Sequence, residues 1–356
     1  MKKHAVKWLG PVLKYGAGFG LLAWVISKYW DDKTDPVTQV TTVGLNTLLQ
    51  GPIDFAWFAA VAALFVAAVS LQLIRWFLLV RALDLPFTLR GSFRLGMVGL
   101  FYNTFIPGSV SGDLVKAIYL AKAHPERKAK AVATVIADRA MGLYGLILFV
   151  AVLGSIAWAA GDPRLVANPN LQGIVKVMAG VASGTAAGFL LLGALPQSRV
   201  DRFAGRLKWI PKLGNSLAEM WYAVWMYRQR LAVVGLGLLL SAGSHFALVF
   251  AFHCASRVFP PKDPATELAT LPEHMVVAPI GFIAQAIPIS PGGVGVGEAA
   301  FGKLYEVCHR PESRGVIARL SLRLVEWLLG LTGYLVFLRM RAEVRELQQS
   351  VESLKS

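Results

Sequence analysis

The amino-acid sequence predicts an all-α polytopic membrane protein with about six full transmembrane helices and two re-entrant hairpins of broken helices. Of its 356 residues, 55% are hydrophobic and 16% are charged, and the mean hydropathy is +0.54. Soluble domains are less apolar and more charged. Apolar stretches near 20 residues recur along the chain, each long enough to cross about 30 Å of hydrocarbon. Two of these stretches are interrupted by proline, glycine and an acid, which indicates helices broken within the membrane.

Six apolar stretches without such a break predict full spans, at about 9–29, 55–82, 131–160, 171–195, 231–257 and 314–340. The first follows a basic start and ends without a small-x-small cleavage site, so we expect an uncleaved span and not a secretion signal. Two further segments, about 95–121 and about 276–303, contain the breaks. Together they predict one integral membrane domain over 1–340, followed by a short charged cytoplasmic tail over 341–356.

The charges of the loops predict the orientation of the chain. Basic residues greatly outnumber acids at about 116–130 and about 199–230, whereas about 28–54 and about 257–274 are mixed. Because cytoplasmic loops carry an excess of Lys and Arg, both basic loops and both termini are expected in the cytoplasm. This requires that about 95–121 enters and leaves on the cytoplasmic side. The same argument makes about 276–303 a hairpin that opens to the exterior.

The formal net charge of +15 is distributed between the spans and not gathered on one soluble module. We therefore expect contact with anionic lipid and no binding of nucleic acid. The predicted location is the inner (cytoplasmic) cell membrane.

Both broken segments carry Ile-Pro-x-Ser, then small residues and an acid, which is Asp113 in the first and Glu298 in the second. Proline removes a backbone N–H, and glycine permits a sharp turn. Half-helices are expected to begin near 111–113 and near 295–298, where free N–H groups and the helix dipole suit an anion. The two acids could instead only stabilise these helix starts. The residues expected to form the breaks are Pro107, Gly108, Gly112, Pro288, Pro291 and Gly292.

The two halves of the chain resemble each other beyond the breaks. "DRAMGLYGLILF" at 138–149 aligns with "EWLLGLTGYLVF" at 326–337, which pairs Asp138 with Glu326 and places two glycines in register. We therefore predict an inverted-topology repeat of about 55–160 and about 231–340. The first span and an interfacial basic loop at about 196–230 are additions to it. Many transporters have this architecture, with discontinuous helices at the repeat interface.

Ionisable and polar side chains in apolar surroundings form the candidate site, because charges at membrane depth are costly and usually functional. Alternatives stay open: Arg75 could snorkel to the interface, the charges could only pair with one another, and Asn103 and Gln285 could only satisfy the broken backbone. The candidate residues for binding a lipid headgroup are Arg75, Asn103, Ser109, Ser111, Asp113, Asp138, Arg139, Gln285, Ser290, Gly293, Glu298, Arg319, Arg323 and Glu326. We expect no catalytic residue, no metal and no cofactor, and the chain has no phosphate-binding G-x-x-x-x-G-K-[ST] motif.

Three stretches, "FYNTFIPGSVSGDLVKAIYL", "ADRAMGL" and "PISPGGVGVGEAAF", precede a last span with an acid. This combination resembles the lysylphosphatidylglycerol synthase transmembrane-region family, a flippase-like group, over about residues 10–340. The resemblance implies movement of a phospholipid, an aminoacyl-lipid, or a polyprenyl-linked or hopanoid lipid. Members that transfer amino acids carry a large soluble domain after the membrane region. This chain ends at Ser356 after a short tail, so we do not expect it to aminoacylate lipid alone.

Three hypotheses follow. The first is a lipid translocase that passes a headgroup through a groove between the repeats, by passive or ion-coupled transport. The second is an integral-membrane transferase that acts on a lipid-linked substrate, and the third is a non-catalytic partner of lipid-synthesis enzymes. The paired breaks and the intramembrane charges favour the translocase.

Overall fold

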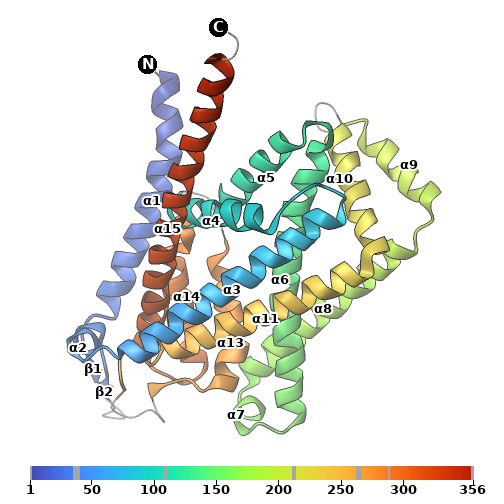
Figure 1. Cartoon of the computed structure of the whole chain (residues 1–356). Coiled ribbons are helices and arrows are strands. Elements are labelled where there is room, and N and C mark those ends of the chain that lie inside the picture. The colour runs from blue at the N-terminus through green and yellow to red at the C-terminus, as the bar shows by residue number, and fades with distance from the viewer. Residues whose placement is uncertain are drawn as a thin grey trace.

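The computed structural model describes residues 2–34, 41–106, 111–210, 214–261, 267–287 and 289–353. Helices make up most of this part of the chain (Figure 1). Within it, the strands are a short antiparallel pair, β1 (Lys33–Thr34) and β2 (Thr41–Thr42). The prediction of an all-α protein is confirmed.

Five helices in the described residues are long and apolar enough to cross a membrane. They are α3 (Phe55–Ala82), α6 (Lys128–Ala159), α8 (Pro169–Ala194), α11 (Leu231–Ala255) and α15 (Glu312–Ser353). The predicted first span is also a helix, α1 (Lys2–Lys28), but it is not among these five. Leucines on α8 and α11 are largely exposed, at 68% for Leu190 and 70% for Leu239. Such exposed apolar faces are expected of helices that contact lipid.

Both predicted breaks separate two helices. The first pair is α4 (Leu89–Phe105) and α5 (Ser111–Ala123), and the second is α13 (Leu271–Gln285) and α14 (Val296–Val307) with the turn η3 (Pro291–Gly293) between them. In each pair the two helices pack against each other. Gly292, Gly293 and Gly295 have φ values of +55°, +67° and +80°, which side chains other than glycine rarely adopt. Pro107, Gly108, Ser109 and Pro288 lie outside the described residues, as does the side chain of Ser111.

Local capping explains where several helices begin. The Asp54 carboxylate accepts hydrogen bonds from the first turn of α3. Thr88 caps α4, so this helix starts six residues before the apolar stretch that predicted it. Thr270 and Glu273 form a capping box at the start of α13. A side-chain oxygen at these positions satisfies backbone N–H groups that have no partner within the helix.

The loop at about 196–230, predicted to be interfacial, contains α9 (Gln197–Leu207), α10 (Gly214–Tyr227) and the turn η2 (Arg228–Arg230). The remaining short elements are α2 (Leu45–Gln50), η1 (Pro125–Arg127) and α7 (Pro163–Val166). α1 begins and α15 ends at the same end of the molecule, where α5 and α9 also lie, whereas α2, the strands and α7 lie at the opposite end (Figure 1).

The helices of the two halves are packed crosswise. α3 lies along α11, α6 packs on α5 and on α13, and α15 packs on α14 and on α4. The last long helix of the first half, α6, therefore contacts its own broken pair and also α13, the first helix of the other broken pair. In the same way, α15 contacts its own broken pair and also α4. This arrangement brings both breaks to the interface between the halves.

α1 contacts both breaks. It packs against η3 and α14 of the second pair, and the Tyr15 hydroxyl donates to the Phe105 carbonyl at the end of α4. A Cβ at Gly18 would lie 2.7 Å from the Cβ of Ser290, so only glycine permits this approach of α1 to the second break.

Candidate functional site

A cavity of about 520 Å³ lies between α3, α4, α5, α6, α11 and the end of α13. Its apolar wall includes Leu73, Leu100, Leu146 and Leu248. A second cavity of about 200 Å³ adjoins it, since Leu100, Asn103, Arg139 and Ala286 line both. The second cavity adds Gln285, Gly292 and Glu326 from the second half of the chain. The polar residues of the larger cavity are Gln72, Arg75, Asn103, Asp113, Lys116, Asp138, Arg139 and His245.

Arg75 of α3 is held inside the protein by two other helices. Its Nε lies 2.8 Å from Asp138 Oδ1 on α6, and its Nη1 donates to Ser241 Oγ on α11 at 2.7 Å. Only 4% of Arg75 is exposed. Its guanidinium therefore points into the protein and does not snorkel to the interface.

Asp113 lies in the first turn of α5 and contacts two cations. Its carboxylate is 2.9 Å from Lys116 Nζ and 2.9 Å from Arg139 Nη1. Lys116 Nζ also lies 3.9 Å from Asp138 Oδ2, which links this pair to the Arg75–Asp138 pair. The cavity wall thus carries a continuous charge network, in which Arg139 has the most exposed side chain, at 43%.

Asn103 joins the two sides of the first break. Its Oδ1 accepts a hydrogen bond from the Gly112 N–H at 2.8 Å, next to the start of α5. Asn103 therefore satisfies one free donor of the broken backbone, and it also lines both cavities.

The second half has its own charge cluster, made by α14 and α15. Arg323 forms an ion pair with Glu298 and donates to the carbonyls of Gly292 and Gly293 at 3.0 Å each. Glu298 also accepts from the Gly295 N–H at 2.7 Å, at the start of α14. Glu298 is 0% exposed and Arg323 is 1% exposed. This ion pair therefore fixes the second break from inside the protein.

Arg319 lies behind the smaller cavity. Its Nε donates to Gln285 Oε1 at 2.7 Å, and its Nη2 donates to Glu326 Oε2 at 2.6 Å. Both acceptor residues line that cavity. Arg319 is fully buried, and its Nη1 has no hydrogen-bond partner among the described residues. A buried charged donor without an acceptor is costly, so an incoming acceptor oxygen would stabilise it.

The candidate residues thus divide into two groups. Those lining one or both cavities are Arg75, Asn103, Asp113, Asp138, Arg139, Gln285, Gly292 and Glu326. Those that line neither are Gly112, Ser290, Pro291, Gly293, Glu298, Arg319 and Arg323. Within the second group, Ser290 Oγ donates to the Val294 carbonyl at 2.7 Å and stabilises the turn of the second break.

Sequence reasoning missed several residues of the site: Gln72, Lys116, Ser241 and His245. The spacing held a signal for two of them. Lys116 follows Asp113 by three residues and Gln72 precedes Arg75 by three, so each pair shares a helix face.

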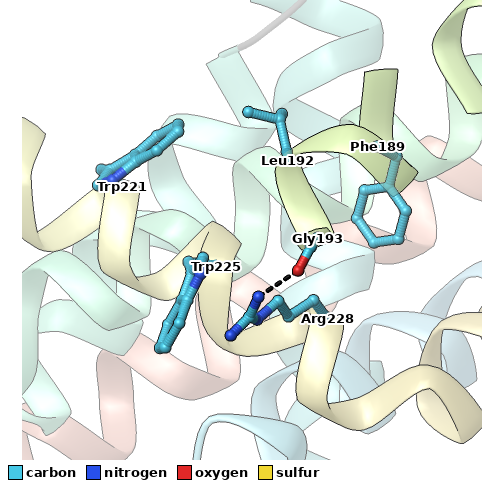
Figure 2. Close-up of a pocket in the computed structure, with 6 residues that line it drawn as sticks. All are labelled: Phe189, Leu192, Gly193, Trp221, Trp225 and Arg228. Atoms are coloured by element: carbon cyan, nitrogen blue, oxygen red, sulfur yellow. Dashed lines mark hydrogen bonds between the residues drawn. The ribbon is translucent and has the colours of Figure 1, made fainter. Parts of the chain in front are cut away.

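A smaller gap of about 20 Å³ lies between the end of α8 and α10, beside Phe189, Leu192, Trp221 and Trp225 (Figure 2). Arg228 donates to the Gly193 carbonyl there, and its guanidinium lies 4.1 Å from the centre of the Trp225 ring. The gap is too small for a headgroup. Arg228, in the turn directly after α10, instead donates hydrogen bonds to carbonyl groups at the end of α8 and so holds the two helices together.

Long apolar helices, interrupted helices and a charged interior cavity define an integral membrane protein. The chain matches the family model described as "Lysylphosphatidylglycerol synthase TM region" over residues 12–353, and it belongs to that family. The family is a membrane domain associated with phospholipids, which confirms the resemblance seen in the sequence. No curated protein and no solved structure matches the chain.

Proposed function

We propose that the protein is a lipid translocase of the bacterial cytoplasmic membrane. A polar headgroup passes through the groove between two inverted repeats while its acyl or prenyl tails stay in the lipid. The observation that supports this most is the pair of adjoining cavities, which are lined by both charged and apolar side chains. A cavity of this mixed character suits an amphiphile.

The charges of the larger cavity favour an anionic headgroup. Three cations, Arg75, Lys116 and Arg139, face two carboxylates, Asp113 and Asp138. The lining of the larger cavity therefore contains one more cation than carboxylates. The free Nη1 of Arg319 lies beyond the smaller cavity. Phosphate, which phospholipids and polyprenyl-linked lipids share, fits both features.

The crosswise packing supports the inverted repeat. When α3, α4, α5 and α6 are matched with α11, α13, α14 and α15, the contacts of one half have counterparts in the other. One detail differs. Gly145 approaches Ser241 of α11, whereas Gly333, its partner in the sequence alignment, approaches Met97 of α4. The two glycines are therefore aligned in sequence but pack on helices that are not equivalent in the two halves.

We also propose an orientation in the membrane. The start of α1, the end of α15 and the basic helix α9 lie at one end of the molecule (Figure 1). We assign this end to the cytoplasm because its loops are basic. The two helix pairs then act as re-entrant hairpins from opposite sides.

The test is reconstitution into liposomes that carry labelled phospholipid, aminoacyl-lipid or polyprenyl phosphate in one leaflet. We expect leaflet exchange of at least one anionic lipid with the wild-type chain. Asp138→Asn should slow it, and Asp84→Asn should not. Asp84 is a matched control because its carboxylate is 63% exposed and pairs only loosely with Arg230, at 3.4 Å. If no candidate lipid exchanges, the proposed function is wrong.

The competing hypothesis is a transferase or an accessory subunit of lipid synthesis. A transferase would replace ours if the purified chain converted a lipid acceptor in the presence of an activated donor. A non-catalytic partner would be favoured over both if a chain with Asp113, Asp138, Glu298 and Glu326 all neutralised behaved like the wild type.

A further inference from the structure

A buried chain of three titratable side chains lies apart from the charged cavity, between α11, α13 and α14. The Nδ1 atoms of His253 and His274 are 2.8 Å apart, and His274 Nε2 lies 2.7 Å from the Tyr305 hydroxyl. His274 and Tyr305 are 0% exposed, whereas His253 is partly exposed. None of these residues lines either cavity, so the proposed headgroup site leaves them without a role.

The short Nδ1–Nδ1 contact limits which protonation states the two rings can adopt. One nitrogen must donate and the other must accept, because two acceptors or two donors would repel each other. If His253 donates, His274 accepts at Nδ1 and donates from Nε2 to Tyr305. The second ring nitrogen of His253 can then take up a proton, and the contact becomes a stronger, charge-assisted hydrogen bond between an imidazolium and an imidazole. A further proton on His274 Nδ1 would break the contact.

The fold does not require titratable groups at this place. In the first half, Ser92 follows the cap Thr88 by four residues, as His274 follows the cap Thr270. Ser92 is buried and simply donates to the Leu73 carbonyl at 2.7 Å. Leu120 follows Asp113 by seven residues, as Tyr305 follows Glu298, and it is a buried leucine. Since buried polar groups in a membrane are costly, the second half contains this chain for a reason other than packing.

The surrounding residues disfavour a permanent positive charge on the two imidazole rings. Among the described residues, the charged side chains that face the three are Arg257, which follows the end of α11, and Arg314 on α15. Arg314 is already paired with Glu267, and Glu273 is turned toward Thr270 and Arg310. The nearby thiols are Cys254 and Cys308. Arg257 Nη1 donates to the His253 carbonyl at 2.9 Å, so it opposes a charge on the rings. Opposition by a cation favours release of a bound proton over permanent retention.

We propose that His253, His274 and Tyr305 form a site that binds one proton and couples proton uptake to movement of the α13–α14 pair. This rests on the proposed translocation. The proton comes from water at the partly exposed side of His253 and adds to its free ring nitrogen without breaking another bond. The imidazolium of His253 then holds His274 of α13 more strongly toward α11 through the charge-assisted hydrogen bond. The position of the second broken pair therefore responds to the proton concentration at that end of the molecule.

Proton binding is tested without any transport. In nanodiscs, the full-length chain with ¹⁵N-labelled histidine is titrated by NMR. We expect the signals of His253 and His274 to shift together with one shared midpoint, and the response of His274 to disappear in His253→Gln. His124→Gln, a change in a loop, should leave the shared transition intact. Separate titration of the two rings, or an unchanged His274 response in His253→Gln, would overturn the site. Tyr305→Phe, which keeps the ring packing, should move the shared midpoint.

The coupling is tested in liposomes at different external pH. Lipid exchange by the wild type and by His124→Gln should depend on pH, and this dependence should be lost in His253→Gln. Equal pH profiles for wild type and His253→Gln would refute the coupling and leave the translocase proposal standing. If no exchange occurs at any pH, the proposed function fails together with the coupling, while the NMR titration still decides whether the proton site exists.

Discussion

Asp113 and Glu298 are each the third residue of the helix that follows a break, but their surroundings differ. Each lies in the first turn of the helix that follows its break. Asp113 faces the larger cavity and contacts Lys116 and Arg139, whereas Glu298 is completely enclosed and pairs with Arg323. The acid that follows the first break therefore adjoins open space, whereas the acid that follows the second is enclosed.

Neutralising Glu298 should destabilise the protein strongly. Glu298→Gln leaves Arg323 without its counter-charge in a site with no access to solvent, and loss of one member of a buried ion pair costs about 3–5 kcal/mol. Thermal unfolding in detergent should show a large decrease in midpoint. Glu306→Gln on the same helix is the control, because Glu306 is 57% exposed and its pair with Lys303 contributes less than about 1 kcal/mol. Equal stabilities of the two variants would contradict the assignment.

Removing Lys116 should slow exchange more than it affects folding. Lys116 bridges the two carboxylates of the cavity, and a hydrogen bond to a charged group contributes about 1.5–3 kcal/mol. Lys116→Met should therefore reduce leaflet exchange of an anionic lipid about tenfold or more. Lys122→Met, six residues later on α5 and exposed, should exchange lipid like the wild type. A zwitterionic lipid that responds as strongly as the anionic one would argue against charge recognition by this network.

Two glycine-to-alanine changes should have opposite effects on stability. A Cβ at Gly333 would approach within 2.9 Å of the Met97 carbonyl carbon, so Gly333→Ala forces α15 away from α4 and should cost about 1–3 kcal/mol. Gly188 on α8 has open space around it, so Gly188→Ala should stabilise the helix by about 0.5–1 kcal/mol. Unfolding midpoints measured side by side decide the matter; a neutral Gly333→Ala would show that the α4–α15 contact is looser than described.

The α9 segment should lie in the lipid interface. Trp209 is 89% exposed and follows a helix whose Arg199, Arg202 and Arg206 are all exposed. A basic amphipathic helix with an exposed indole is typical of binding to anionic membrane surfaces. In a variant in which Trp209 is labelled with 5-fluorotryptophan, brominated lipids should quench or broaden its signal. Arg202→Glu together with Arg206→Glu should weaken this effect in anionic bilayers and leave it unchanged in neutral ones.

The hydroxyl of Tyr222 fastens α10 to this basic helix by donating to Asp201 at 2.8 Å. That carboxylate raises the pKa of Tyr222 above its usual value. The contact therefore persists through neutral pH, and quenching should not change between pH 6 and pH 8.

Much of the helical architecture was predictable because apolar length and proline breaks are local signals. The position of α4 was less so. Its start depends on Thr88, a polar cap that no hydropathy pattern marks. Lys116 was counted among the loop charges, yet α5 continues to Ala123 and turns this side chain into the cavity. His253 falls within the predicted span at about 231–257, but its partner His274 comes from another helix. Such contacts depend on which helices meet, and one sequence does not show that.

The position of α1 limits how the two breaks can move. Tyr15 holds the end of α4, and Gly18 lies against the turn of the second break. Because the single helix α1 contacts both broken pairs, a shift of one pair would be transmitted to the other. Under the proposed translocation, this coupling would prevent the groove from opening to both sides of the membrane at once, so ions would not leak through the protein.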